Sequence, residues 1–316
     1  MHKIHHYLLR FCPHSRAKVK TASRKKTTIS ARIIRNNSNL ASETLRGASF
    51  NFTEFYKAHK YIEANWLEWF IGFVEGDGGI YTHNGRLSFV ITQDESAILY
   101  HIKDQLGFGN VRFDKGVQSY RYVVSDLSTI VLLMHLFNGN LVLEHRIRQL
   151  AFWINQIKIN KRLPHLAELV HITSSPIISL NDGWLSGITD AEGCFNIHIT
   201  PRLANTVGFN TKLRFIIDQN DTKALNLIRN IFNTGFVSQR KSNLAAFRYT
   251  SSSLKGSEIV VLYFNAFPLK TFKKEAFIKW CDIRVMMANK EHLHLEGFTK
   301  IRALAYLVND KTKIND

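Results

Sequence analysis

The chain has 316 residues, with 42 Lys and Arg against 25 Asp and Glu, and 45% of its residues are hydrophobic. This length suits one large domain or two ordinary ones, and the formal charge of +17 favours a polyanionic partner, nucleic acid above all. No apolar run reaches transmembrane length, which excludes a spanning helix, and the three scattered cysteines show neither disulfide nor zinc spacing.

The segment of residues 1–50 carries 11 basic residues and a single acid, Glu43, and so holds +10 of the total charge. It is rich in Ser, Thr and Arg and has no sustained apolar period, so we expect little order before Phe50. This composition is typical of an organellar transit peptide. It is equally typical of a basic arm on DNA, or of a leader fused from an upstream reading frame.

A short apolar helix that ends in an acid and a glycine is predicted from Trp69 to Gly78, and a variant of it returns from Trp184 to Gly193. Each copy has two small residues four positions apart, which places them on one helix face one turn apart. These pairs are Gly72 with Gly76 and Gly187 with Ala191. Two such faces can bring helix backbones very close together, because no side chain stands between them.

Asp77 and Glu192 come directly after these small-residue faces. A carboxylate at a helix C-terminus is unfavourable, since the exposed carbonyl groups already make that end negative. Two acids at two closely packed helix ends therefore concentrate negative charge at one place, and this pattern predicts a bound divalent cation there. Hard oxygen ligands without a Cys/His cluster favour magnesium over zinc.

The remaining elements of the first half follow from period and turn signals. Asn65 and Glu68 resemble a helix capping box. Two strands, 80–82 and 87–92, are joined by a turn at His83-Asn84-Gly85. The elements predicted after them are an amphipathic helix capped by Asp94-Glu95-Ser96 and ending at Gly107, strands at 110–113 and 119–124, and helices at about 127–137 and 141–159.

The second half repeats this order. The segment Leu87–Gln93 matches Leu213–Gln219 at a separation of 126 positions, whereas the motif acids are 115 apart. The second copy therefore carries 11 extra residues, near Pro201–Lys212 at the tip of its first hairpin. We predict an α+β fold of two pseudo-symmetric αββαββα subdomains with antiparallel sheets. The expected boundaries are 51–160 for the first subdomain, 161–180 for a linker and 181–316 for the second subdomain.

The endings Glu-Gly-Asp-Gly at 75–78 and Asp-Ala-Glu-Gly at 190–193 resemble the two Asp-Ala-Asp-Gly endings of a single-chain LAGLIDADG homing endonuclease of the organellar, intron-encoded type. The resemblance covers about residues 52–308, and His292–Phe298 resembles a closing segment of the family. It implies that the motif helices pack at the symmetry axis and that the sheets form a DNA-binding saddle. It also implies a monomeric, metal-dependent phosphodiester hydrolase that makes a double-strand cut in a long asymmetric DNA target, located in the mitochondrion or in a chloroplast.

By this resemblance, Asp77 and Glu192 are catalytic metal ligands, one for each strand, for two or three Mg²⁺ ions, with the backbone carbonyls of Gly76 and Ala191 as helpers. Glu in the second copy departs from the commonest form of the motif and puts the symmetry of the site in doubt. The aligned acids Glu75 and Asp190 point to a different helix face, and we interpret them as structural groups.

The family also places a basic residue near each scissile phosphate. Aligning Trp153 with Trp280 pairs Arg146 with Lys273 for this role, and Arg148 and Lys274 are the competing candidates. Gln93 and Gln219 match across the repeat, and each either reaches the active-site water network or caps the next helix.

DNA contacts are expected from alternate residues on the exposed sheet faces, where polar side chains alternate with apolar ones. A polar sheet with Arg and Lys can enter the major groove, although each basic residue alone is more often a phosphate contact than a base reader. The candidates are Arg86, Arg121, Asn196, His198, Lys212, Arg214, Arg240, Lys241 and Arg248.

Two other functions remain open. One is a maturase-like protein that binds its own intron RNA without cleaving, and the other is a transcription regulator that uses the saddle only for binding. Neither function requires both motif acids, and this chain has both.

Overall fold

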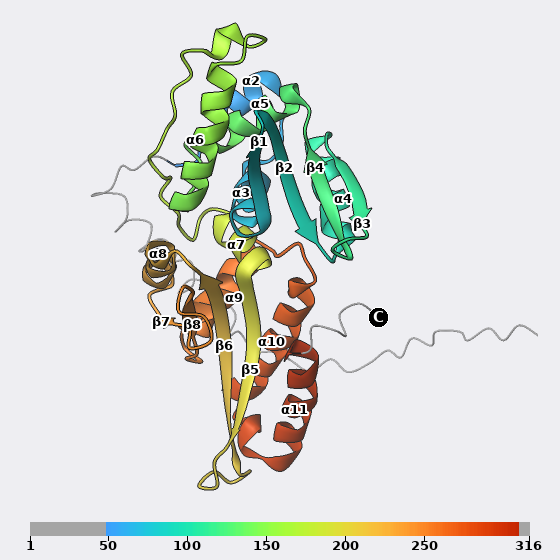
Figure 1. Ribbon diagram of the computed structural model, residues 1–316. Coiled ribbons are helices and arrows are strands. Elements are labelled where there is room, and N and C mark those ends of the chain that lie inside the picture. Colours follow the sequence, from blue (N-terminus) through green and yellow to red (C-terminus); the bar gives the residue numbers. More distant parts are fainter. Residues whose placement is uncertain (1–48, 310–316) are drawn as a thin grey trace, which may run out of the picture. The chain divides into compact units, whose positions relative to one another are not determined.

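The computed structural model describes residues 49–309, which fold as two copies of one arrangement of helices and strands (Figure 1). A short helix, α2 (Thr53–Ala58), precedes the first copy. The first copy consists of α3 (Ala64–Asp77), β1 (Gly78–His83), β2 (Arg86–Gln93), α4 (Ser96–Leu106), β3 (Asn110–Asp114), β4 (Ser119–Val124), α5 (Leu127–Phe137) and α6 (Glu144–Lys158).

The second copy follows a connection that contains one 3₁₀ turn, η1 (Pro164–Leu166), and then neither helix nor strand up to residue 183. It consists of α7 (Trp184–Glu192), β5 (Gly193–Pro201), β6 (Phe209–Gln219), α8 (Thr222–Phe232), β7 (Phe236–Gln239), β8 (Phe247–Ser251), α9 (Ser257–Ala266) and α10 (Lys273–Ala288). A 3₁₀ turn η2 (Glu291–Leu293) and helix α11 (Leu295–Asn309) come last. Each copy closes with two helices, and both closing helices of the first copy, α5 and α6, were predicted from the sequence, so the αββαββα pattern omits only the last of them.

Both sheets have four antiparallel strands in the same order, β1-β2-β4-β3 and β5-β6-β8-β7. The strand register preserves the repeat, because Tyr81 pairs with Ser88 at the place where Asn196 pairs with Arg214. Within β6, Phe215 is fully buried while its neighbour Arg214 is only half-buried. One face of each sheet thus packs on the core and the other presents polar side chains, as the alternation predicts. The predicted α+β class is confirmed.

The two motif helices, α3 and α7, cross in direct backbone contact. A Cβ atom added to Gly187 would overlap the carbonyl oxygen of Trp69 and lie 2.6 Å from the nitrogen of Phe73. A Cβ atom on Gly72 would overlap the carbonyl oxygen of Trp184 in the same way. Glycine is therefore required at both crossing positions, and the packing predicted from the small-residue spacing is confirmed.

One continuous hydrophobic core runs through both copies. Its largest buried side chains include two equivalent pairs of tryptophans, Trp69 with Trp184 and Trp153 with Trp280. Among residues 49–309, no helix has the length and apolar character needed to cross a membrane.

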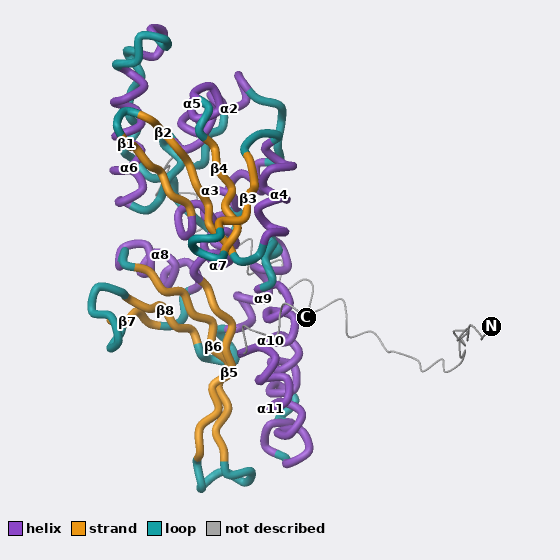
Figure 2. The backbone as a smooth tube through the Cα atoms, turned by 45° about the vertical axis from the view of Figure 1, so that its right-hand side comes forward, coloured by secondary structure: helices purple, strands orange, loops and turns teal. Residues whose placement is uncertain are grey.

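The first hairpin of the second copy is longer than its counterpart. Strands β5 and β6 have 9 and 11 residues, whereas β1 and β2 have 6 and 8. Figure 2 shows this hairpin extending beyond the rest of its sheet, and α11 runs alongside it, with Phe298 stacked on Phe209 near the tip. The extra residues thus lengthen the hairpin, as the repeat offsets predict.

The predicted capping box of Asn65 and Glu68 is wrong. Helix α3 begins at Ala64, after Glu63, and no side chain caps its start. Glu68 instead accepts a hydrogen bond of 2.8 Å from the backbone nitrogen of Gly183, at the start of the other motif helix. The segment 1–48 lies outside the described residues, and Phe50 already packs against the core.

Candidate active site

The two motif acids lie together where α3 and α7 end. A Cβ atom on Gly76 would overlap the Cβ of Ala191 and lie 3.1 Å from the Cγ of Glu192, so the two helix ends touch. Asp77 and Glu192 are both half-buried. Burial raises the pKa of both carboxyl groups, and the charge of Asp77 raises the pKa of Glu192 further. Two ionised acids at this point repel each other, and a bound cation would offset that repulsion.

A basic side chain caps each of these helix ends. From α6, Arg146 donates Nε to the carbonyl of Glu75 (3.0 Å) and Nη2 to that of Gly76 (3.1 Å). From α10, Lys273 donates Nζ to the equivalent carbonyls of Asp190 (2.6 Å) and Ala191 (2.7 Å). A positive charge at a helix C-terminus satisfies the free carbonyl groups and opposes the negative end of the helix dipole. The structure thus brings the pair predicted by the tryptophan alignment to the acids.

The competing basic residues do not cap a motif helix, although Arg148 lines a hollow that also contains Glu192. Arg148 is exposed and forms an ion pair of 2.8 Å with Glu144 on its own helix. Lys274 is exposed next to Lys273 on α10. In the described part of the chain, neither of these two side chains hydrogen-bonds to the end of α3 or α7. They serve as matched positions for mutational controls.

Glu75 and Asp190 are buried beside the site and tie the two motif helices together. Glu75 accepts hydrogen bonds from the indole of Trp184 (2.6 Å) and from the backbone nitrogens of Val142 and Leu143. Asp190 accepts from the indole of Trp69 (2.8 Å). Burial raises the pKa of Glu75 to about 7, and its three N–H donors oppose that shift. Each acid is thus saturated by donors within the fold.

The matched glutamines behave differently in the two copies. Gln93 donates Nε2 to Oδ2 of Asp77 at 2.5 Å. Gln219 instead accepts from the backbone nitrogen of Asn220, in the loop before α8. The first glutamine therefore contacts the motif acid of its own copy, whereas the second lines the hollow beside Glu192 and bonds to the next residue of its own loop. The two halves of the site are not identical.

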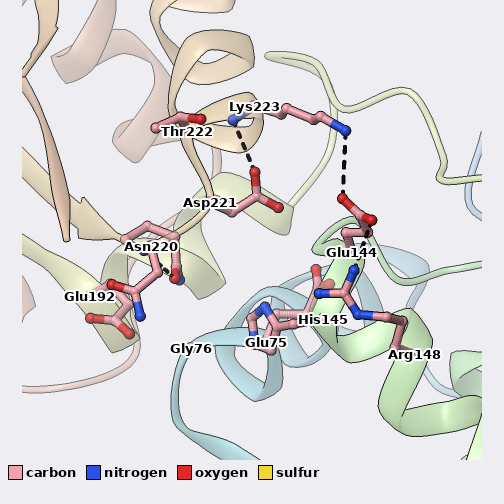
Figure 3. A pocket seen from close by; sticks show the side chains of 11 residues that line it. Glu75, Gly76, Glu144, His145, Arg148, Glu192, Asn220, Asp221, Thr222 and Lys223 are labelled. Carbon is pink, nitrogen blue, oxygen red and sulfur yellow. Dashed lines mark hydrogen bonds and ion pairs between the residues drawn. The ribbon is translucent and has the colours of Figure 1, made fainter. Parts of the chain in front are cut away.

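A hollow of about 640 Å³ opens beside Glu192 and Gly76 (Figure 3). Its walls come from the starts of α6 and α8, and they are joined across the opening by an exposed ion pair between Lys223 and Glu144 (3.5 Å). The half-buried His145 also lines it, and burial lowers the pKa of this imidazole. The acid of the second copy is thus accessible from this side.

The residues present suit a hard divalent cation. In residues 49–309, no group of three or more His, Cys, Asp or Glu side chains could hold a metal ion, so the site is no closed cage of the zinc type. Two carboxylates at touching helix ends supply oxygen ligands only, and such a site leaves the remaining positions of the ion to water and substrate oxygens. The carbonyl oxygens of Gly76 and Ala191, the expected helpers, accept hydrogen bonds from Arg146 and Lys273.

The predicted DNA-contacting residues of the first sheet lie on its polar face. Arg86 is exposed at the start of β2. Arg121 on β4 forms an ion pair of 2.8 Å with Asp114 on the neighbouring strand β3. Sequence reasoning missed Arg112, which pairs with Arg121 in the strand register and is exposed. The alternation of Asn110, Arg112 and Asp114 along β3 was the available signal.

In the second sheet, an acid that the sequence reasoning did not consider organises two of the candidates. Asp218 accepts two hydrogen bonds of 2.6 Å from Arg248, and it forms an ion pair of 3.1 Å with Arg240. Lys212 on β6 and Lys241 after β7 are exposed. The other three candidates gather at the β5 edge, where Asn196 and Arg214 contact each other and His198 lies two pairs further along the register.

The chain belongs to the LAGLIDADG endonuclease family, whose two motif regions match residues 70–157 and 185–284. Endonucleases of this family use divalent metal ions. The similar proteins include "Probable intron-encoded endonuclease 4" of Neurospora crassa, which is 34% identical over 82% of this chain and 46% of its own length. An uncharacterised 37.2 kDa protein of cox1 intron 2 in Schizosaccharomyces pombe is 25% identical over 73% of this chain and 69% of its own. The chain thus spans about half the length of the Neurospora relative.

Solved structures share the fold. The LAGLIDADG meganuclease I-AabMI bound to uncleaved DNA has a TM-score of 0.62 and 24% identity, over 77% of this chain and 99% of that one. I-SmaMI bound to an uncleaved DNA target in the presence of calcium ions has a TM-score of 0.62 and 18% identity, over 79% of this chain and 100% of that one. At these identities the likeness concerns the architecture of two copies with two four-stranded sheets.

Proposed function

We propose that this protein is a single-chain homing endonuclease that cuts both strands of a long, asymmetric duplex DNA site with Mg²⁺. The observation that carries this proposal is the meeting of Asp77 and Glu192 at two touching helix ends, each end capped by a basic side chain. Two equivalent acids suit two strands of opposite direction. Membership of the endonuclease family and the net charge of +17 support the same function.

In this proposal Asp77 and Glu192 hold the divalent ions, and their helix ends keep the two carboxylates in place. A bound divalent ion supplies an activated water and relieves charge on the phosphate and the leaving oxygen. Arg146 and Lys273 place fixed positive charge at the same point, where negative charge grows during phosphodiester hydrolysis. Gln93 holds the carboxylate of Asp77 in one orientation.

The asymmetry of the target follows from the differences between the copies. The equivalent residue pairs on the polar faces are Tyr81 with Ser88 in one sheet and Asn196 with Arg214 in the other. The hairpin lengths differ as well. Because each half-site meets different side chains, the two halves of the target are expected to differ in sequence. One chain supplies both halves, so the proposed active form is a monomer.

Similar proteins are named for introns of the cox1 and ND4 genes, and the mitochondrion is therefore the proposed location, with the chloroplast as alternative. Homing of the intron that encodes the protein is the proposed biological role. An RNA-binding role without cleavage is not favoured, since it would not require the two acids at the helix ends.

The function is tested by selecting cleaved molecules from a randomised duplex DNA library with the full chain and Mg²⁺. We expect one long asymmetric site to be enriched and cut on both strands. The same reaction with Ca²⁺ should give binding of that site with little or no cleavage. If no duplex is cut under any divalent ion, the endonuclease proposal is wrong.

We expect Arg146→Met and Lys273→Met to slow single-turnover cleavage about 10- to 1,000-fold, the range typical of removing one group that stabilises transition-state charge. DNA affinity should remain nearly unchanged, because the charge matters most in the transition state. Both variants also lose hydrogen bonds to helix carbonyls, so their melting temperatures should be measured beside the rates.

Matched controls for these two variants are Arg148→Met and Lys274→Met, which remove the same charges from exposed neighbouring positions. We expect both controls to cleave at close to the wild-type rate. Loss of affinity with an unchanged cleavage step in the Arg146 and Lys273 variants would assign these residues to phosphate binding instead.

Removing residues 1–47 should leave specific cleavage intact and weaken non-specific DNA binding. The deleted part carries 11 Lys and Arg, and each lost phosphate contact lowers the salt dependence of binding by roughly one unit. The truncation must end before residue 49, because Phe50 packs on the core and the backbone nitrogen of Asn51 donates a hydrogen bond to Asn140. The slope of affinity against salt is the measurement, and an unfolded truncation would contradict the boundary.

A further inference from the structure

The last described residue, Asn309, binds the free edge of strand β5. Its Oδ1 accepts from the backbone nitrogen of Ile197 (3.0 Å), and its Nδ2 donates to the carbonyl oxygen of the same residue (2.9 Å). The carboxamide thus takes the place of a neighbouring strand at this edge. The same Oδ1 also accepts from Nδ2 of Asn196 at 2.8 Å. Through Asn309, helix α11 thereby holds the side chain of Asn196 on the polar face of the sheet.

Asn196 in turn orients an arginine. Its Oδ1 accepts from both Nε (2.9 Å) and Nη2 (2.5 Å) of Arg214, the residue directly opposite in the strand register. The amide of Asn196 is fixed at both ends, because its nitrogen donates to Asn309 while its oxygen accepts from Arg214. A chain of three side chains therefore runs from α11 to one guanidinium.

The donors left on Arg214 have a defined direction. A guanidinium has five N–H groups in a planar fork, and Asn196 uses one on Nε and one on Nη2. The outer pair of Nη1 and Nη2 hydrogens is not used by Asn196, and the half-buried Arg214 lines a hollow between β5 and α11. Within residues 49–309 Arg214 forms no ion pair, whereas Arg121 and Arg248 are held by carboxylates. An outer pair of parallel donors matches the O6 and N7 acceptors of guanine in the major groove.

We propose that Asn309 is a positioning residue for DNA recognition, which holds Asn196 and thereby aims Arg214 at one guanine of the target. The guanine belongs to the half-site that lies under β5 and β6. The first copy has no equivalent device in the described part of the chain, since its corresponding pair is Tyr81 and Ser88 and no helix between residues 49 and 309 corresponds to α11. This inference rests on the proposed binding of duplex DNA and assigns one base-reading contact within it.

The test uses the full chain and the site enriched in the cleavage selection. Affinities are measured in Ca²⁺ for that site and for its single-base variants, with wild-type protein, Arg214→Ala, Asn309→Ala and the double variant. We expect Arg214→Ala to lose about 10- to 100-fold of discrimination at one G·C pair, the range of a bidentate base contact. Asn309→Ala should lose about 2- to 10-fold at the same pair, the value of ordering one long side chain. In the double variant, Asn309→Ala should add nothing.

Two further variants separate positioning from a structural role. Asn309→Asp keeps the acceptor for Asn196 and for the Ile197 nitrogen, so it should retain most of the discrimination. Lys300→Ala removes an exposed charge of the same helix that pairs with Glu296, and it should change nothing at this base pair. Melting temperatures of all variants show whether the β5 edge stays folded.

Several results would overturn the inference while leaving the endonuclease proposal standing. If Asn309→Ala weakens binding to all sequences equally, Arg214 contacts phosphate or α11 only stabilises the sheet. If Arg214→Ala changes preference at no base pair, the guanine contact is absent. Failure of the wild-type protein to bind any duplex would instead contradict the proposed function itself.

Discussion

Replacing Asp77 by Asn together with Glu192 by Gln should abolish double-strand cleavage and leave a folded protein that still binds its DNA site. The rate is expected to fall about 1,000-fold or more, because bound metal supplies several kcal/mol of transition-state stabilisation and about 1.4 kcal/mol corresponds to a factor of ten. The substitutions keep the shape of both side chains and remove only their charge. Each single variant should leave slow nicking of one strand.

Folding should survive, and at neutral pH it should improve. Burial raises the pKa of both carboxyl groups in the folded state, so the folded protein binds their protons more tightly than the unfolded chain. This contribution to stability is fully present below the unfolded pKa and is lost as pH rises through the folded pKa. The charge-free variant does not suffer this loss. Its stability advantage should therefore be largest at neutral and alkaline pH and should vanish in acid.

Cleavage by the wild-type protein should show the matching pH dependence. The metal ligands must be ionised, so the rate should rise with pH through a range above that of exposed Asp and Glu. Single-turnover rates and melting curves from about pH 5 to 8 test both expectations. Glu144→Gln, an exposed acid at the rim of the hollow, is a suitable control and should keep nearly full activity. Double-strand breaks at the wild-type rate by the double variant would refute the assignment of the metal ligands.

Gly187→Ala should unfold the protein or destabilise it by about 3 kcal/mol or more, at the upper end of overpacking effects. The new methyl group would overlap the carbonyl oxygen of Trp69 and lie 2.6 Å from the nitrogen of Phe73. Both atoms belong to the backbone of α3, so no side-chain rotation can make room. The two helices would have to separate, which would also break the hydrogen bond from Trp69 to Asp190.

Denaturant and thermal unfolding measure this effect, and Gly72→Ala should behave alike. Gly116→Ala is the control, since its Cβ would meet only the side chain of Asp114, at 3.2 Å in an exposed turn. We expect that control to stay within about 0.5 kcal/mol of wild type. A Gly187→Ala protein that melts close to the wild-type temperature would mean that the helices cross less closely than the structure has them.

Local sequence patterns were enough to predict most of the helices and strands and the two motif acids. Helix α5 occupies the predicted residues 127–137, and Asn84 and Gly85 have the positive φ angles of the predicted tight turn. These features depend on neighbours only a few positions away. The repeat then placed Asp77 and Glu192 as equivalent residues, because duplicated segments fold alike and small-residue faces allow close helix packing.

Only the tertiary structure decided how the polar side chains are partnered. Glu68 looked like the acid of a capping box, yet it binds Gly183, 115 positions away. Asp218 holds Arg248, and Asn309 holds Asn196 across 113 positions. A polar side chain has several possible donors and acceptors within reach, and its choice depends on which distant segments the packed core brings beside it. The sequence by itself therefore determined the fold, the repeat and the motif acids, whereas the folded core decided which distant polar groups pair with one another.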